Sequence, residues 1–341
     1  MNKPLVKQFI PLLLAVLFIG AGCVFQNPTV PVAPDEQTVA PSAETFVGAI
    51  RSFDDAGVAT VQLADGSTEQ VRPNAMPILV KTDVGSLFTF EGVRDPSTRI
   101  IDLTDLTPMS DKNLVVVSPA PNATVTSPLV VSGFGRVFEQ QFAWRIKDAT
   151  GAVVDQGSAM THAPDAGQFG PYSFEVFLPA MTDVRFALEM LEYSAKDGSE
   201  TNLVNVPLTL LSTKSLTLKA YFPNAKQGSS ADCSKVFAVD RQVAETSAVG
   251  RAAIAELLKG PTVAERGSGY STAIPGAAAL NSLVIGGRVA TANFNEQLNP
   301  PGGSCAVTAI RAQIENTILQ FDTVDSVTIQ VNGDAATALQ P

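Results

Sequence analysis

The sequence predicts a multidomain protein that is mainly β, with an α+β segment at its C-terminal end. At 341 residues the chain is longer than one ordinary core, because a domain holds roughly 100 to 200 residues. Charged residues make up only 16% of the chain, while Gly and Pro number 25 and 23, a composition typical of many short strands and turns. Alternating apolar runs come first, and helical spacing enters only after about residue 213.

The charge balance bears on the class of partner. The formal net charge is −10 and the isoelectric point is near 4.7. Binding to nucleic acid depends on clustered Lys and Arg that neutralise phosphates, and no such stripe exists in this sequence. We therefore expect no nucleic-acid partner.

The first 22 residues are typical of an export signal. Lys3 and Lys7 give a positive start, and residues 9–21 form an apolar run of the length of a signal peptide core. This run is short for a membrane span. We predict a signal peptide over residues 1–22.

The signal ends at 20–23, Gly-Ala-Gly-Cys, which resembles a bacterial lipobox. The resemblance implies that Cys23 receives a diacylglycerol and becomes the mature N-terminus. Gly20 departs from the pattern, because an aliphatic residue is usual three positions before the cysteine. The alternative is an uncleaved signal anchor in which Cys23 has no role. Residues 23–43 follow with repeated Pro and no periodicity, which predicts an extended tether from the membrane.

The other two cysteines, Cys233 and Cys305, form an even pair in an oxidising compartment. We predict a disulfide between them, worth roughly 4 kcal/mol in the chain-entropy model because the closed loop is long. The alternative is a reactive thiol at Cys305, which comes where a helix is expected to begin.

Residues 44–108 contain about five short alternating runs, which predict a small β-barrel of the oligonucleotide/oligosaccharide-binding (OB) type. The dipeptide at 65–66, Asp-Gly, lies between two of the runs and predicts a hairpin. The fold alone does not identify a ligand.

Residues 113–211 hold seven longer runs separated by Pro- and Gly-containing turns, which predict an immunoglobulin-like β-sandwich. Trp144 is expected in its core rather than on the surface as a sugar platform. The segment resembles the Gmad-type immunoglobulin-like domain of spore-germination and related envelope proteins. The residues that carry this resemblance are 118–121, 127–128, Gly133, 137–139, 142–144, Asp148, Gly151, 170–174 and 192–199.

Residues 214–341 mix strands and helices. Helical spacing predicts helices over 248–259 and about 305–320, with Ser304 as the N-cap of the second. Strands are expected around them, including a hairpin at 286–287 and a short final strand after 332–333.

The same segment resembles the GerMN domain of a spore-germination and sporulation protein. The resemblance implies an α+β fold with two helices on a small sheet, no known catalytic residues, and a place in extracytoplasmic lipoproteins. The matching residues are 221–222, Arg241, 256–261, 272–275, 289–294, 302–304, 320–321 and 331–333.

No residue is assigned to catalysis, to a metal or to a cofactor. The single histidine, His162, is expected in a loop without a triad around it. Gly-rich residues 300–304 precede a helix but lack the Lys of a phosphate loop. Several acidic residues have the spacing of turns or of a solvated surface: Asp54, Asp55, Asp65, Glu189 with Glu192, and Asp322 with Asp325.

These features predict a lipid-anchored binding or scaffold protein on the outer face of the cell membrane, similar to germination and sporulation proteins and without enzymatic activity. Its expected partners are the membrane through the lipid, and envelope proteins or cell-wall polymer. The alternative is a cell-wall polysaccharide-binding lipoprotein, which aromatic residues exposed together on one face would favour. An envelope hydrolase would need a cleft with a perturbed acid or nucleophile.

Overall fold

The computed structural model describes residues 43–73, 79–299 and 303–340. The predicted signal peptide, Cys23 and nearly all of the predicted tether lie outside these residues. All of the described residues belong to one compact unit.

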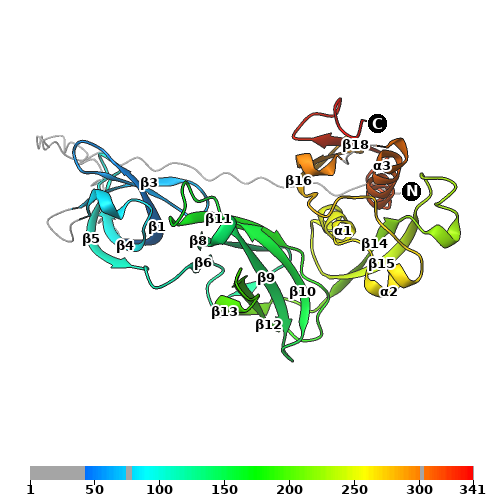
Figure 1. The fold of residues 1–341 in the computed structure, drawn as a ribbon. Coiled ribbons are helices and arrows are strands. Elements are labelled where there is room, and N and C mark those ends of the chain that lie inside the picture. The colour runs from blue at the N-terminus through cyan, green and yellow to red at the C-terminus, as the bar shows by residue number, and fades with distance from the viewer. Residues whose placement is uncertain (1–42, 74–78, 300–302, 341) are drawn as a thin grey trace, which may run out of the picture. The chain divides into compact units, whose positions relative to one another are not determined.

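The first domain is a closed barrel of five strands (Figure 1). Its strand order is β1-β2-β3-β5-β4, with β3 and β5 parallel and every other pair antiparallel. Alternate residues such as Ile50, Val61 and Phe90 fill the interior and are fully buried. The predicted small barrel is therefore confirmed. The strands are β1 (Ala43–Phe53), β2 (Ala59–Gln62), β3 (Thr68–Pro73), β4 (Leu87–Arg94) and β5 (Ile101–Pro108), with the short helix η1 (Lys81–Asp83) before β4.

The hairpin between β2 and β3 turns at the predicted Asp-Gly pair. Gly66 has φ +87°, a conformation that glycine adopts without steric cost. The Asp65 carboxylate accepts hydrogen bonds from the N–H and the hydroxyl of Ser67. These local bonds hold the pKa of Asp65 below its usual value, so turn formation accounts for this carboxylate.

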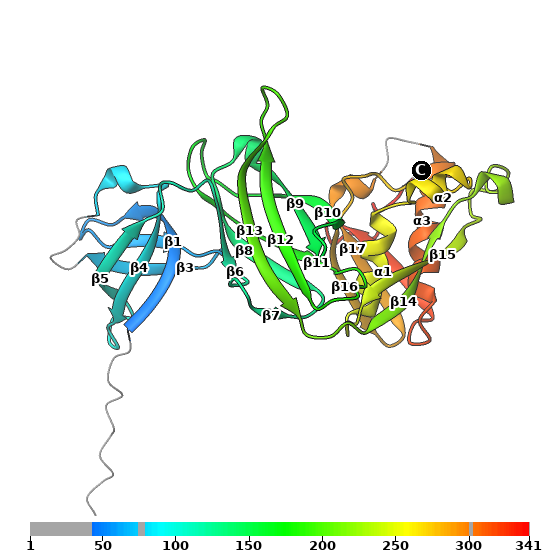
Figure 2. The ribbon, with the colours of Figure 1, turned by 90° about the horizontal axis from the view of Figure 1, so that it is seen from below.

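The second domain is a sandwich of a five-stranded sheet, β10-β9-β12-β13-β7, and a three-stranded sheet, β11-β8-β6 (Figure 2). Phe142 and Ile146 of β9 and Leu188 of β12 are buried in the core between the sheets. All seven predicted runs form strands, and a two-residue strand, β7, is added. The bounds are β6 (Leu114–Ser118), β7 (Thr124–Val125), β8 (Leu129–Gly135), η2 (Phe138–Gln140), β9 (Gln141–Asp148), β10 (Val153–Met160), β11 (Gly170–Val176), β12 (Arg185–Tyr193) and β13 (Glu200–Leu210).

The third domain has three helices and two small sheets, a two-stranded sheet β14-β15 and a three-stranded sheet β16-β17-β18. The predicted stripe of α3 is confirmed, because Val307, Ile310, Ile314 and Ile318 are all buried. The helix α3 contacts α1, β14 and β18. The bounds are β14 (Ser215–Phe222), η3 (Ala225–Gln227), β15 (Phe237–Ala244), α1 (Val249–Leu258), α2 (Val263–Gly267), β16 (Leu280–Gly286), β17 (Val289–Phe294), η4 (Glu296–Leu298), α3 (Ser304–Leu319) and β18 (Ser326–Val331).

Five details of the third domain differ from expectation. The sheet is divided in two, and a further helix, α2, begins at a capping box in which Thr262 and Glu265 bond to each other's backbone N–H. The N-cap of α3 is Gly303 rather than Ser304, which is the first helical residue.

The hairpin between β16 and β17 turns on Gly287 and Arg288, both with positive φ, one residue later than expected. After β18 the described chain forms turns and an isolated bridge between Val331 and Asp334, not a final strand.

Backbone and apolar contacts join neighbouring domains. Between the second and third domains, the Ala244 N–H donates to the Leu178 carbonyl at 2.9 Å and the Ala180 N–H donates to the Gln242 carbonyl at 3.2 Å. Between the first and second domains, the Phe169 N–H donates to the Gly85 carbonyl at 3.0 Å, and the buried Phe169 ring packs in a cluster with Leu87 of the barrel. These contacts extend the hydrogen-bonded structure across both junctions.

Gly133 faces Tyr172, which is buried in the core of the sandwich. The Tyr172 hydroxyl donates to the Val115 carbonyl at 2.8 Å, in a place where burial raises the pKa of the phenol well above its usual range. A Cβ on Gly133 would lie 2.0 Å from that carbonyl oxygen and 2.4 Å from the hydroxyl. Only glycine leaves room for this bond.

We predict that Gly133→Ala destabilises the sandwich by at least about 1–3 kcal/mol, because the added methyl overpacks the core and displaces the Tyr172 hydroxyl. Urea unfolding of the full chain measures the effect. Gly286→Ala is the matched control, since its Cβ would meet no atom within 4 Å, and it should change the midpoint little. Equal midpoints for Gly133→Ala and wild type would contradict the prediction.

Candidate functional site

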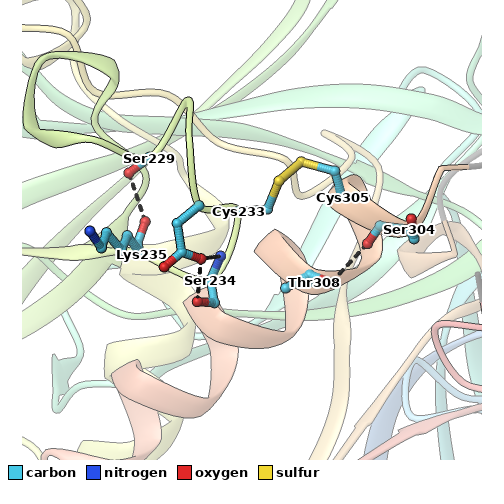
Figure 3. Close-up of a disulfide and its surroundings, with 8 residues drawn as sticks. Ser229, Cys233, Ser234, Lys235, Ser304, Cys305 and Thr308 are labelled. Carbon is cyan, nitrogen blue, oxygen red and sulfur yellow. Dashed lines mark hydrogen bonds between the residues drawn. A yellow bond between two sulfur atoms is a disulfide. The ribbon is translucent and has the colours of Figure 1, made fainter.

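Among the residues with sequence-based roles, Cys233 and Cys305 come together in a disulfide (Figure 3). Their Cα atoms are 5.4 Å apart and 72 positions separate them in the chain. Cys305 lies in the first turn of α3, and Cys233 lies in the loop between β14 and β15. The Asp232 carboxylate accepts from the N–H and the hydroxyl of Ser234, which shapes this loop beside the disulfide. The bond therefore ties a long loop to the start of a buried helix.

Most of the other residues singled out by their type or spacing lie in loops or on the surface. His162 lies in a loop, as predicted, and among the described residues no three His, Cys, Asp or Glu side chains are placed to hold a metal ion. No helix in the described parts of the chain is long and apolar enough to cross a membrane. Asp322 and Asp325 are exposed, as predicted.

The prediction that Glu189 is a surface carboxylate was wrong. Its side chain is 8% exposed, and it accepts from the Arg145 and Lys147 side chains on the neighbouring strand β9. Burial acts to raise the pKa of Glu189, but these two cations outweigh it and the pKa is lowered. Spacing along β12 could not show this, because the partners lie across the sheet.

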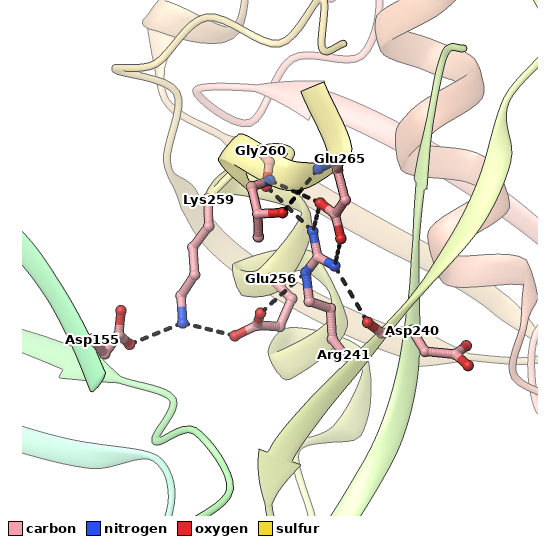
Figure 4. Close-up of polar contacts among 8 residues, drawn as sticks. Asp155, Asp240, Arg241, Glu256, Lys259, Gly260 and Glu265 are labelled. Carbon is pink, nitrogen blue, oxygen red and sulfur yellow. Dashed lines mark hydrogen bonds and ion pairs between the residues drawn. The ribbon is translucent and has the colours of Figure 1, made fainter. Parts of the chain in front are cut away.

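A largely buried ion network lies in the third domain and reaches Asp155 of the second domain (Figure 4). Arg241 of β15 donates from two nitrogens to the Glu265 carboxylate, at 2.6 and 2.8 Å, and its third nitrogen lies 3.6 Å from Glu256. Side-chain exposure is only 11% for Arg241 and 9% for Glu256. Lys259 donates to Glu256 at 2.7 Å and to Asp155 of β10 at 2.9 Å.

The network changes the pKa of two of its ionisable groups. Burial acts to raise the pKa of Glu265, but hydrogen bonds from the Arg241 guanidinium and from the Thr262 N–H lower it overall. Burial acts to lower the pKa of Lys259, and the Glu256 and Asp155 carboxylates reverse the effect, so the pKa is raised. Both shifts favour the charged forms. The groups are bound to one another, so we interpret the network as structural.

A hollow with aromatic walls lies on the outer face of the five-stranded sheet of the sandwich. Because Phe142 and Ile146 point into the core, Ala143 and Arg145 between them belong to the opposite face. Ala143 is paired with Ser158 of β10 and Leu191 of β12. Because the Ala143 side chain is small, the surface of the sheet is hollowed at this position.

Two adjoining hollows result, of about 330 and 290 Å³, which share Ala143, Ser158 and Tyr193. We call them together the outer-face groove. Phe138 and Glu192 line the larger hollow, and Trp144 and Gln156 line the smaller one. The Phe138 and Tyr193 side chains are 69% and 58% exposed. Trp144 is half-buried and stacks on Phe174 with ring centroids 6.0 Å apart, so it belongs mainly to the core, as predicted.

The loop that presents Phe138 has an unusual backbone. Glu139 and Gln140 have φ of 52° and 58°, a left-handed conformation that costs about 1–3 kcal/mol for each non-glycine residue. The Phe138 N–H donates to a Glu192 carboxylate oxygen at 3.0 Å, and the Gln140 carbonyl accepts from the Thr161 N–H at 2.8 Å. These bonds offset the strain and keep the Phe138 ring in solvent.

Comparison with known families assigns two of the domains. Residues 113–199 match the family described as "Immunoglobulin-like domain of bacterial spore germination", and residues 219–337 match the family described as "Sporulation and spore germination". Neither description names a reaction. No curated protein matches the chain.

Among solved structures, the first GerMN domain of the sporulation protein GerM from Bacillus subtilis matches with 21% identity and a TM-score of 0.29, over 35% of this chain and 84% of that chain. The tandem GerMN domains of the same protein match with 15% identity and a TM-score of 0.27, over 35% of this chain and 40% of that one. A putative lipoprotein from Clostridium perfringens matches with 18% identity and a TM-score of 0.23, over 35% and 76% of the respective chains. The domain assignment rests on the two family models.

We predict that Arg241→Ala destabilises the third domain by about 3–5 kcal/mol, because it leaves the buried Glu256 and Glu265 without their guanidinium. Guanidinium chloride unfolding of the full chain measures this. Arg288→Ala is the matched control: it breaks an ion pair with Asp325 in which both side chains are more than half exposed, and it should cost at most about 1 kcal/mol. Similar losses for both variants would refute a special role for burial.

We predict that the double variant Cys233→Ser, Cys305→Ser loses about 4 kcal/mol of stability, since the closed loop of 72 residues no longer restricts the unfolded chain. Wild type in dithiothreitol should match the double variant, and the double variant should not respond to dithiothreitol. Unfolding followed by circular dichroism provides the midpoints, and a midpoint of wild type that ignores the reductant would contradict the prediction.

The chain thus has a sporulation- and germination-type domain architecture, in which an immunoglobulin-like domain at residues 113–199 precedes a sporulation and spore germination domain at residues 219–337.

Proposed function

We propose that this chain is a lipid-anchored, extracytoplasmic binding and scaffold protein of the cell envelope, and that it acts without catalysing a reaction. The observation that carries the proposal is the pair of adjacent domains whose families are described by spore germination and sporulation. The export-type leader that ends in Cys23 supports the location. The Cys233–Cys305 disulfide supports it as well, because such bonds persist mainly outside the cytosol.

The junctions between domains support a scaffold role. Backbone hydrogen bonds and shared apolar clusters join each domain to the next. The ion pair between Arg251 of α1 and Glu175 of β11 adds a further link. Ionisable groups with a lowered pKa, such as Glu189 and Glu265, are bound by cations rather than free in a cleft, which disfavours a hydrolase.

We predict that Cys23→Ser abolishes incorporation of radiolabelled palmitate. The thiol is the acceptor of the lipid, so serine removes the anchor without altering the leader. Cys233→Ser is the control, because that residue is remote from the leader and the label should be retained. Unlabelled wild-type protein, or wild type dissolved in the cytosol, would overturn the anchoring proposal.

The binding role is tested separately. Crosslinking in intact cells, followed by mass spectrometry of what is attached to the third domain, should identify envelope proteins. Recovery of the chain alone would count against a scaffold role.

A second candidate function, binding of cell-wall polysaccharide, is favoured by one specific observation. Phe138 and Tyr193, two aromatic side chains that are more than half exposed, line the same hollow. Exposed aromatic rings offer an apolar face with large contact area, which a folded domain usually buries.

A further inference from the structure

We infer that the outer-face groove of the immunoglobulin-like domain is a binding site for an uncharged oligosaccharide. This inference deepens the proposed function and rests on it only for the place where such a glycan would be met. The groove is defined by the two hollows that share Ala143, Ser158 and Tyr193.

The aromatic side chains provide the first part of the argument. The Phe138 and Tyr193 rings, both largely exposed, line one hollow of about 330 Å³. A sugar ring has apolar C–H faces and a polar rim, so it can lie against an aromatic face while its hydroxyls reach polar groups. A concave site with apolar walls and a few polar groups is the usual form of a small-ligand site.

The backbone of the aromatic loop provides the second, independent part. Two consecutive non-glycine residues, Glu139 and Gln140, adopt left-handed φ, and strained backbone of this kind is concentrated at ligand-binding sites. Glu192 holds the loop by accepting from the Phe138 N–H, and the Asn202 amide donates to the other Glu192 oxygen. The loop therefore keeps two strained residues, Glu139 and Gln140, next to the exposed Phe138 ring.

The polar groups of the groove fit hydroxyls and amides. Gln141, Gln156 and Ser158 line the two hollows with donors and acceptors. The middle of a protein–protein interface is usually depleted of charge, whereas Glu192 and Glu139 line the larger hollow here. The lining therefore favours a sugar over an apolar peptide.

The charged residues of the groove indicate whether it would bind an anionic or an uncharged polymer. Its one cation, Arg145, is already bound by Glu189 and by both oxygens of Glu200, at 2.7 and 3.0 Å. Within the two hollows a phosphate-rich polymer would meet the carboxylates of Glu139 and Glu192, while Arg136, which binds the Asn113 amide oxygen, lines only the neighbouring hollow of about 680 Å³. The geometry points to an uncharged chain.

The ring of Trp144, the sole tryptophan of the sequence, stacks on Phe174 on the core side of β9, so binding to the groove is best measured by calorimetry. The full-length protein, purified in detergent, is titrated with chitohexaose, cellohexaose and maltohexaose, and with poly(glycerol phosphate) as the anionic probe. At least one uncharged hexaose should give a saturable titration with a defined Kd by isothermal calorimetry. The anionic polymer should produce no saturable change.

Tyr193→Ala and Phe138→Ala should each raise the Kd at least tenfold by calorimetry. Val130→Ala is the matched control, since that side chain is 51% exposed on β8 in the other sheet of the domain, and it should leave the Kd unchanged. Because all three side chains are exposed, the variants should keep the wild-type melting temperature, which is checked alongside.

Failure of all three hexaoses to bind would overturn the inference, as would binding that neither aromatic variant weakens. Preferential binding of poly(glycerol phosphate) would overturn it too. A Tyr193→Ala defect in crosslinking to an envelope protein, with no sugar bound by wild type, would reassign the groove to a protein. These outcomes are independent of acylation at Cys23, so they do not depend on the anchoring test.

Discussion

The alternation of side chains along β9 and β12 is the constraint on which the second domain depends. Because successive residues point to opposite faces, the same two strands bury Phe142, Ile146 and Leu188 against the three-stranded sheet and present Ala143 and Arg145 outward. A shift of one residue in the pairing would exchange the core with the ion pairs of Glu189. The sandwich core and the outer-face groove are therefore fixed by one register.

In the third domain, the buried charged residues depend on their mutual ion pairs. Arg241, Glu256 and Glu265 are removed from water, and such groups persist only when each finds its counter-charge and further hydrogen bonds. The network joins β15 to α1 and α2, so it specifies how those elements meet rather than adding greatly to stability. Its residues at 241 and 256–261 also belong to the set that carries the GerMN resemblance, and this packing gives that set a physical meaning.

Local patterns predicted most of the elements. The alternating runs of the barrel, the seven strands of the sandwich and the buried stripe of α3 follow from hydrophobic period, and the Asp-Gly turn follows from glycine's tolerance of positive φ. The helix α2 was missed although Thr262-x-x-Glu265 is a capping signature, because five residues are too few for a periodic signal.

Features that arise between distant residues could not be predicted. Burial of Glu189 depends on cations across the sheet, and the position of Phe138 on the same hollow as Tyr193 depends on a loop held by Glu192, 54 positions away from Phe138 in the chain. The predicted lipidation site at Cys23 lies outside the described residues. Phe138, the aromatic residue of 137–139, was part of the Gmad resemblance, but nothing in the sequence around it indicates exposure.

The edge of the five-stranded sheet has a protective feature. β10 is the outermost strand, with backbone groups on one side that another chain could pair with. A register shift between Val153 and Asp155 interrupts its regularity, and the Lys259 ammonium binds the Asp155 carboxylate at this edge. An irregular strand with a fixed charge is a poor template for cross-β growth, so this arrangement disfavours edge-to-edge aggregation of a mainly β protein.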